Sequence, residues 1–195
     1  MDLRKRAVTA TFDVFSWVYD APLLQRWAYR PPQDEVIAQL RAHKSQRIAD
    51  IGCGTGILAE RIQRELQPAA VYGVDLSDGM LDKARERSTT VQWRQSPAES
   101  LPFADGELDA VVSTTAFHFF DQPAALREFH RVLAPSGVFV LAALAPRIPL
   151  LDNHVPRELR ELLVAAGFTV DEQRPVGRAQ LTKLSPDVLT VASRS

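Results

Sequence analysis

The sequence predicts a Rossmann-like α/β fold: a doubly wound, mainly parallel sheet with an antiparallel C-terminal strand. Short apolar runs alternate with longer segments of helical periodicity through most of the chain. The apolar runs are nearly continuous, as expected for strands that helices cover on both faces. One run ends at Asp50 and leads into glycine at every second position, at Gly52, Gly54 and Gly56. A strand turning sharply into a helix fits this pattern, and doubly wound sheets bind ligands at such turns.

The composition is that of a single globular domain with a substantial core. The chain has 195 residues, of which 46% are hydrophobic and 24% charged, and its net charge is −1. This balance argues against nucleic acid as the main partner. Cys53 is the single cysteine, so no internal disulfide is possible, and we expect a reducing, cytoplasmic compartment. We expect neither a signal peptide nor a membrane span.

Seven apolar segments are predicted as strands. The turn Ala104-Asp105-Gly106 introduces the fourth, and Pro135-Ser136-Gly137 introduces the fifth. The last two have no clear helix between them, so a hairpin would add the antiparallel strand. The predicted strands are Arg47–Ile51, Val71–Asp75, Val91–Trp93, Leu108–Ser113, Val138–Leu144, Phe168–Gln173 and Val188–Ala192.

Periodicity and local start and stop signals predict the helices. Ser77 is placed to cap the third helix, Pro123 suits a first turn, and Gly167 ends the last helix. Pro31-Pro32 is expected to break the chain before the first helix. The predicted helices are Asp34–His43, Ile57–Leu66, Asp78–Arg87, Gln122–Leu133 and Pro156–Ala166.

An aromatic-rich segment precedes this alternating pattern. Phe12, Phe15 and Tyr19 have helical spacing, which predicts a helix with one apolar face. Such a helix either packs on the core or covers a ligand as a lid. We divide the chain into a helical lid segment, residues 1–30, and a single domain, residues 31–195.

The glycine loop can be tested against known ligand classes. A dinucleotide fingerprint needs its third glycine at Ile57, and a P-loop needs Gly-Lys-Ser/Thr, so neither pattern is present. Asp50, directly before the loop, would repel a pyrophosphate but suits an ammonium group. Asp75, nineteen residues after Gly56, ends the second predicted strand, where an acid can bind ribose hydroxyls. S-adenosylmethionine, a nucleoside that carries an amino acid, satisfies both acids.

The chain resembles the class I S-adenosylmethionine-dependent methyltransferases, and within them the type 11 group that includes ubiquinone/menaquinone-biosynthesis methyltransferases. The resemblance covers about residues 10–145. It rests on Ala49–Gly56, on Val71–Ser77 with Met80, on Ala98–Phe103 followed by Leu108-Asp109, on Arg131–Gly137, and on the pairs Phe12-Asp13 and Tyr19-Asp20.

The resemblance implies roles for individual residues. The three loop glycines would pack against the methionine part of the cofactor, Asp50 would steer its amino group, and Asp75 would grip the ribose. Pro97 stands where the family usually has Asp or Asn on the adenine amino group, so that contact would come from the Ala98 backbone or the Glu99 side chain. The full predicted cofactor-binding set is Tyr19, Asp50, Gly52, Cys53, Gly54, Thr55, Gly56, Asp75, Leu76, Met80, Pro97, Ala98, Glu99 and Ser113.

His118 is the candidate catalytic residue. It follows the fourth predicted strand among Phe117, Phe119 and Phe120, where type 11 relatives commonly have a histidine or aromatic residue facing the acceptor. It would act as a base only if the acceptor loses a proton, and a histidine satisfied by a backbone group is an equal alternative. No metal is predicted, because Asp152-Asn153 lacks the companion acid after the fourth strand that a catechol-type metal site requires.

The predicted function is methyl transfer to a small, apolar or aromatic molecule, by O- or C-methylation. The Pro-Pro-aromatic signature of DNA amino-methyltransferases is absent at Ser113-Thr114-Thr115. No cysteine outside the cofactor loop could serve pyrimidine C5 methylation. A non-catalytic module that kept the fold is the main alternative. A nicotinamide-linked oxidoreductase is disfavoured by the glycine spacing.

Overall fold

A computed structural model describes residues 30–144, 155–176 and 187–195, which form a seven-stranded sheet in the order β3-β2-β1-β4-β5-β7-β6. The five strands from β3 to β5 are parallel, and β7 is antiparallel to both β5 and β6. The strands are β1 (Arg47–Ile51), β2 (Ala70–Asp75), β3 (Gln92–Gln95), β4 (Leu108–Thr114), β5 (Leu133–Leu144), β6 (Phe168–Val176) and β7 (Asp187–Arg194). The predicted doubly wound fold and its antiparallel hairpin are thereby confirmed.

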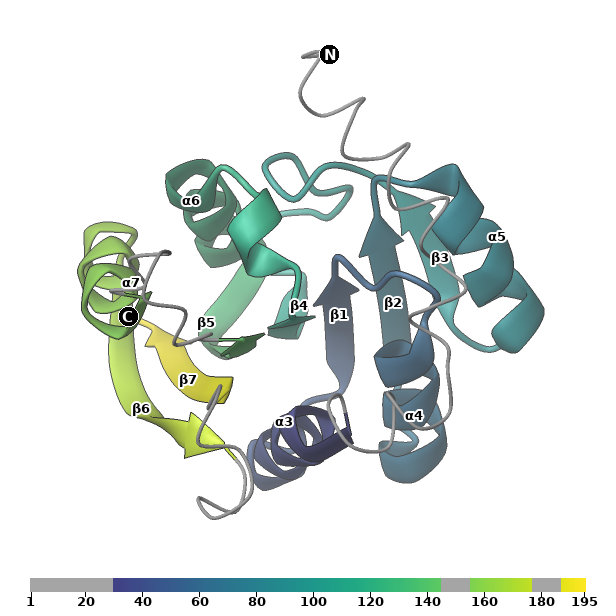
Figure 1. Ribbon diagram of the computed structural model, residues 1–195, viewed down its shortest axis with the longest axis horizontal. Coiled ribbons are helices and arrows are strands. Elements are labelled where there is room, and N and C mark those ends of the chain that lie inside the picture. Colours follow the sequence, from purple (N-terminus) through teal and green to yellow (C-terminus); the bar gives the residue numbers. More distant parts are fainter. Residues whose placement is uncertain (1–29, 145–154, 177–186) are drawn as a thin grey trace.

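Helices cover both faces of the sheet (Figure 1). One buried cluster joins α3 and α4 to the sheet through residues such as Val36, Leu40 and Ile62, and α5 packs against β3 and α4. The opposite cluster joins α6 and α7 to the sheet through residues such as Phe129 and Leu163. The helices are α3 (Arg30–Ala42), α4 (Ile57–Leu66), α5 (Asp78–Arg87), α6 (Gln122–Val132) and α7 (Val155–Ala165), with a short 3-10 helix η2 (Phe117–Phe119) after β4.

Three predicted boundaries differ from the structure by three residues or more. Pro31-Pro32 does not break the chain: both prolines lie in the first turn of α3, where a missing amide hydrogen is harmless. Strand β5 begins at Leu133 and contains the predicted turn as an irregularity, with Ser136 at φ 64°. Strand β6 continues to Val176 because β7 pairs with it along its whole length.

A loop takes the place of a helix on the α6 face. Between β3 and β4, Ala98, Leu101 and Phe103 are buried in the same cluster as Phe129. Arg131 of α6 donates hydrogen bonds to the carbonyl oxygens of Phe103, at 3.0 Å, and Leu101, at 3.3 Å. The loop is therefore fixed to the core, although it has no regular structure.

The predicted lid segment, residues 1–30, lies outside the described residues except for Arg30, the first residue of α3. In the described part of the chain, no helix is both long and apolar enough to cross a membrane.

Candidate cofactor site

The predicted site residues that the structure describes lie near the carboxyl ends of the parallel strands, at the top of Figure 1, and the loop between β1 and α4 is the centre of this site. Its glycines all have left-handed backbones, with φ 72° at Gly52, 53° at Gly54 and 79° at Gly56. A Cβ on Gly52 would lie 2.4 Å from the Cβ of Ala116. A Cβ on Gly54 would meet no heavy atom of the described residues within 4 Å. The loop is thus packed against protein at Gly52 and open to a ligand at Gly54.

The indole ring of Trp93, from β3, packs against both the glycine loop and β2. A Cβ on Gly56 would lie 2.4 Å from the ring, and a Cβ on Gly73, in β2, would lie 2.2 Å from it. Trp93 also donates a hydrogen bond from Nε1 to the carbonyl of Ser88 at 2.9 Å. Because glycine makes room for the ring on both sides, Trp93 fixes the start of α4 relative to the sheet.

The Asp75 carboxylate, at the end of β2, bridges two loops. Its Oδ2 accepts a hydrogen bond from the amide of Gly54 at 2.8 Å, and its Oδ1 accepts one from the amide of Ser77 at 2.9 Å. Asp75 is half-buried, and an ionised carboxylate can accept about four hydrogen bonds. Asp75 therefore holds the tip of the glycine loop while its side chain remains partly accessible.

Asp50, at the end of β1, is a buried carboxylate that receives no hydrogen bond from the described residues. Its exposure is 1%. Burial, and then the negative charge of Asp75, raises the pKa of Asp50 to about 7. The backbone amide of Ala59, in the first turn of α4, partly opposes this rise in pKa. It does not meet the geometry of a hydrogen bond to Asp50. Ionising a buried acid without donors is unfavourable, and a cationic ligand group here would compensate for it.

Two apolar side chains, Leu76 and Met80, follow Asp75 in the chain. Met80, in α5, is buried, and Leu76 is half-buried directly after Asp75. Burial, followed by the charges of Asp50 and Asp75, raises the pKa of the Cys53 thiol. Cys53 is therefore protonated and acts in packing, beside Gly73. An apolar surface next to an acid suits a nucleoside.

The loop after β3 forms the next wall of the site. The amide of Ser96 donates to the carbonyl of Asp75 at 3.1 Å, which ties the loop to the end of β2. Pro97 is half-buried and Ala98 is 6% exposed. Glu99, predicted to contact adenine, accepts a hydrogen bond on Oε1 from the amide of Asp121 at 2.8 Å. This last contact links the loop to the start of α6.

The chain after β4 forms an aromatic turn, which we define as residues 117–120. Thr115 precedes it in the left-handed region with φ 56°, an unusual conformation for a β-branched residue. Phe117 is 4% exposed, whereas Phe119 is 46% exposed and its ring centroid lies 3.8 Å from that of His118. The His118 side chain is also exposed, yet nearby atoms desolvate its ring enough to lower its pKa. The turn is thus anchored by the buried side chain of Phe117, whereas its His118-Phe119 pair is exposed.

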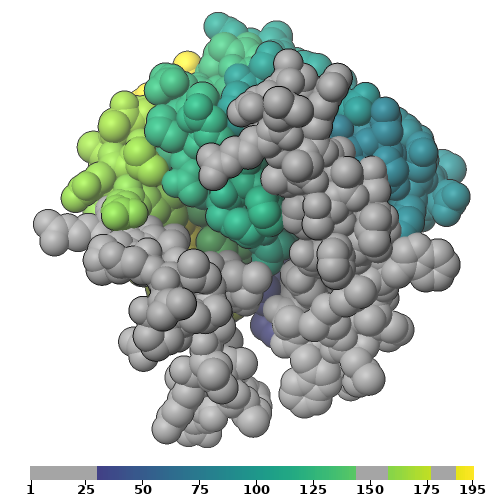
Figure 2. All heavy atoms as spheres, turned by 45° about the horizontal axis from the view of Figure 1, so that its top comes forward, coloured from purple at the N-terminus to yellow at the C-terminus, as the bar shows by residue number. Residues whose placement is uncertain are grey.

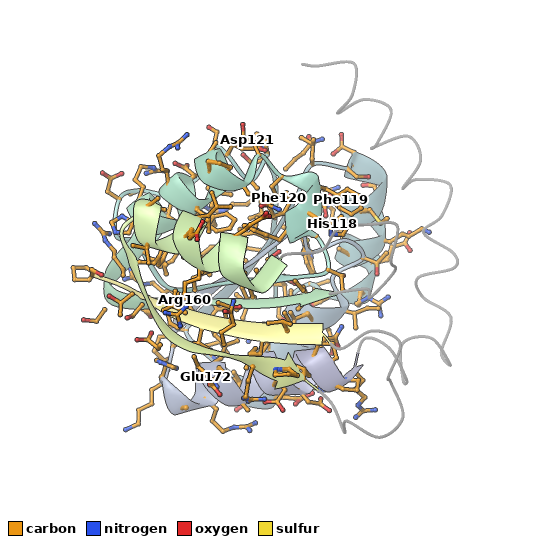
Figure 3. The ribbon with its side chains drawn as sticks, turned by 60° about the vertical axis from the view of Figure 1, so that its left-hand side comes forward. His118, Phe119, Phe120, Asp121, Arg160 and Glu172 are labelled. Carbon is orange, nitrogen blue, oxygen red and sulfur yellow. The ribbon has the colours of Figure 1, made fainter. Side chains whose placement is uncertain are left out.

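Two views show where the aromatic turn lies. In Figure 3 the residues from His118 to Asp121 gather at the upper end of the molecule, and Glu172 lies at the lower end. With the top of Figure 1 turned forward, the green surface after β4 lies between α7 on the left and α5 on the right (Figure 2). The turn therefore belongs to the same end of the sheet as the glycine loop.

The remaining predicted residues are placed as follows. Ser113 is fully buried and donates from Oγ to the carbonyl of Ile51 at 2.8 Å, so it supports the end of β1. The carbonyl of buried Thr55 accepts a hydrogen bond from Arg87 at 2.8 Å. Tyr19 and Asp152-Asn153 lie outside the described residues. Within the described ranges, no three His, Cys, Asp or Glu side chains are grouped to hold a metal ion.

Sequence reasoning missed the support that Trp93 and Arg87 give to the glycine loop. Gly73 was an available signal, because a glycine inside an apolar strand often marks a close approach of another group. Arg87 had no such signal, since its partner is the Thr55 carbonyl on another element.

The site fits S-adenosylmethionine. Asp50, a buried acid without a hydrogen bond from the described residues, would suit the ammonium group, and Asp75, a partly accessible acid beside apolar side chains, would suit the ribose. The glycine loop is open at Gly54. Fold and site together define a class I S-adenosylmethionine-dependent methyltransferase domain. Residues 49–141 match the type 11 family described as "Methyltransferase domain", which identifies this segment as a domain of that family. Its cofactor is S-adenosylmethionine.

Similar proteins support this assignment. The malonyl-[acyl-carrier protein] O-methyltransferase of Serratia marcescens is 32% identical over 144 residues, which cover 73% of this chain and 54% of that protein. The demethylmenaquinone methyltransferase of Chlorobaculum parvum is 33% identical over 117 residues, covering 59% of this chain and 48% of that protein. The chain thus spans about half the length of these relatives.

A solved structure shows the same fold. Magnesium protoporphyrin IX methyltransferase from Synechocystis PCC 6803, with bound S-adenosylmethionine, superimposes with a TM-score of 0.77 at 20% identity. The match covers 100% of this chain and 98% of that one.

Proposed function

We propose that this protein transfers the methyl group of S-adenosylmethionine to a small apolar or aromatic acceptor, by O- or C-methylation. The supporting observation is the exposed His118-Phe119 pair, which belongs to a turn that packs on Gly52 of the cofactor loop. Apolar and aromatic side chains beside a reactive group are typical of sites for small organic ligands.

The chain's own residues would bind and orient the cofactor. The Asp50 carboxylate would receive the ammonium group, and Asp75 would bind the ribose hydroxyls beside Leu76 and Met80. The open backbone at Gly54 leaves room for the methionine part. When bound, the cofactor supplies an electrophilic methyl group on a sulfonium. The protein contributes alignment and exclusion of water, because an in-line displacement depends on geometry.

His118 would serve as a general base for substrates that lose a proton when they are methylated. Desolvation lowers its pKa below the ordinary value of 6.5, so the ring is neutral at pH 7 and has a nitrogen lone pair available. A proton released by a phenol or an activated carbon would move to this imidazole nitrogen. An acceptor that is already an anion, such as a carboxylate, would not need His118.

We also propose that residues 1–30 form a lid that contributes to acceptor binding, as a unit distinct from residues 31–195. Its support is the aromatic spacing of Phe12, Phe15 and Tyr19 in the sequence.

Incubation of the protein with methyl-labelled S-adenosylmethionine and a panel of acceptors tests the function. The panel should include a demethylmenaquinone-type naphthoquinol, simple phenols and a malonyl thioester, since the relatives' names point to two of these. Labelled product from an aromatic acceptor supports the proposal. Product from the malonyl thioester alone would contradict the acceptor class. Tight cofactor binding without any product would favour the non-catalytic alternative.

A further inference from the structure

Glu99 connects the loop after β3 with the chain after β4. Its Oε1 accepts a hydrogen bond from the Asp121 amide at 2.8 Å. Asp121 is the N-cap of α6: its Oδ1 accepts from the amide of Ala124 at 3.2 Å, and its carbonyl accepts from the amide of Ala125 at 2.8 Å. Glu99 therefore holds the residue at which the aromatic turn ends and α6 begins.

The other side of the aromatic turn rests on the glycine loop. A Cβ on Gly52 would lie 2.4 Å from the Cβ of Ala116 and 3.1 Å from Cζ of Phe120. The Phe120 ring also meets Phe117 edge-on, with centroids 6.0 Å apart. The turn thus contacts the glycine loop at Gly52. Asp121, directly after the turn, is hydrogen-bonded to Glu99 in the loop after β3.

The backbone before the turn is strained, so its conformation depends on surrounding contacts. Thr115 has φ 56°, and a β-branched residue in this region is strained. The amide of Thr115 donates to the carbonyl of Ala142 at 3.1 Å, which fixes the start of the turn. Such a conformation persists only where surrounding contacts determine it, and Glu99 supplies the contact at the far end.

We propose that Glu99 is a positioning residue, whose carboxylate holds the Asp121 amide and thereby keeps the His118-Phe119 pair in place over the glycine loop. This role differs from the direct adenine contact expected from the sequence. Its relevance to the acceptor rests on the proposed function, whereas the positioning itself does not.

Two pairs of variants isolate the hydrogen bond. Glu99→Ala removes the acceptor, and Glu99→Gln keeps a side-chain oxygen that can accept from the same amide. Asp121→Pro removes the donor amide without touching Glu99, and Asp121→Ala is its match because both lose the Asp121 cap. Proline suits this position, since Asp121 has φ −70° and Phe120 before it is extended, with ψ 159°. Glu107→Ala controls for loss of another loop glutamate that accepts a backbone hydrogen bond, from Ala104 at 2.7 Å.

Amide hydrogen exchange of Phe119 and Phe120, with and without S-adenosylhomocysteine, gives the main readout. In Glu99→Ala and Asp121→Pro we expect exchange about tenfold faster, as for loss of one charge-assisted hydrogen bond. Glu99→Gln, Asp121→Ala and Glu107→Ala should exchange within about threefold of the unmodified protein. Titration calorimetry of Glu99→Ala with S-adenosylhomocysteine then shows whether the side chain also binds the cofactor.

Unchanged exchange in both Glu99→Ala and Asp121→Pro would overturn the proposal. A loss of cofactor affinity of tenfold or more in Glu99→Ala, with unchanged exchange, would instead make Glu99 a cofactor ligand. Because neither measurement uses an acceptor, failure of the proposed methyl transfer would be seen separately, in the labelling assay.

Discussion

Asp75 ends β2, Asp50 lies one residue before the end of the adjacent parallel strand β1, and the charge of Asp75 adds to burial in keeping a proton on Asp50 up to about pH 7. The unfolded chain releases that proton near pH 3.8. Between these values the folded protein binds more protons than the unfolded chain, so its free energy of unfolding falls as the pH rises. Above about pH 7 Asp50 is ionised in both states, so the stabilisation from its raised pKa has been lost and the free energy of unfolding no longer depends on its titration.

The ligand-free protein should therefore lose about 4 kcal/mol of stability from Asp50 as the pH rises from 4 to above 7. Asp50→Asn, which cannot ionise, should lack this dependence and be more stable than the unmodified protein at pH 8. Urea unfolding at pH 5.0, 6.5 and 8.0 measures it. Equal pH slopes for the two proteins would show that Asp50 does not titrate in this range.

The glycine loop allows a contrast between two similar substitutions. Gly52→Ala adds a Cβ 2.4 Å from that of Ala116 and should cost about 3 kcal/mol or more of stability. Gly54→Ala meets no described atom within 4 Å and should cost only about 1 kcal/mol, for its left-handed backbone.

Gly54→Ala should nonetheless weaken S-adenosylhomocysteine binding by tenfold or more, because its methyl group projects into the open space above the loop. Thermal unfolding and titration calorimetry on both variants separate the two effects. Cofactor affinity that survives in Gly54→Ala would mean that the ligand does not approach the loop there.

Trp93→Ala should destabilise the protein by about 2 kcal/mol, since it removes the half-buried ring that fills the space beside Gly56 and Gly73. The glycine loop should loosen, so S-adenosylhomocysteine affinity should fall too. Trp93→Phe keeps most of the ring volume and serves as the control. If Trp93→Ala binds the cofactor as tightly as Trp93→Phe does, the ring is not needed to hold the loop.

Titration of His118 should govern how kcat for methyl transfer to a phenolic acceptor depends on pH. Its pKa is lowered, so kcat should rise with pH through a midpoint below pH 6.5, as the ring becomes neutral. His118→Gln should lower kcat by about 100-fold and remove this limb, with S-adenosylhomocysteine affinity unchanged. A profile that His118→Gln leaves in place would assign the titration to another group.

Removal of residues 1–30 should weaken acceptor binding more than cofactor binding. The KM for the acceptor is compared with the calorimetric affinity for S-adenosylhomocysteine in the shortened and full chains. Loss of cofactor binding in the shortened chain would oppose a lid role that is restricted to the acceptor.

The sequence predicts the cofactor side of the molecule well because its signals there are local. β1, α4 and α5 have the predicted bounds, marked by the glycine loop and by Ser77, whose hydroxyl accepts from the amide of Met80 at 3.2 Å. The Pro31-Pro32 prediction was wrong because proline both stops helices and suits their first turn.

What the sequence does not predict depends on contacts between distant segments. Glu99 meets Asp121 across 22 positions, and Trp93 meets Gly56 and Gly73 from a different strand. Neither residue differs in type or spacing from an ordinary loop acid or strand aromatic. Only the arrangement of the strands brings these groups together, so pattern and propensity do not reveal them.

Strand β6 is an edge of the sheet, and its composition makes it a poor template for another chain. Asp171, Glu172 and Arg174 bring charges to the strand, its pairing with β7 shifts register between Val170 and Glu172, and Pro175 lacks an amide hydrogen to donate. Charge, irregularity and proline are the features by which proteins discourage edge-to-edge aggregation. The antiparallel hairpin therefore does more than extend the sheet: it ends the sheet in a strand that resists self-association.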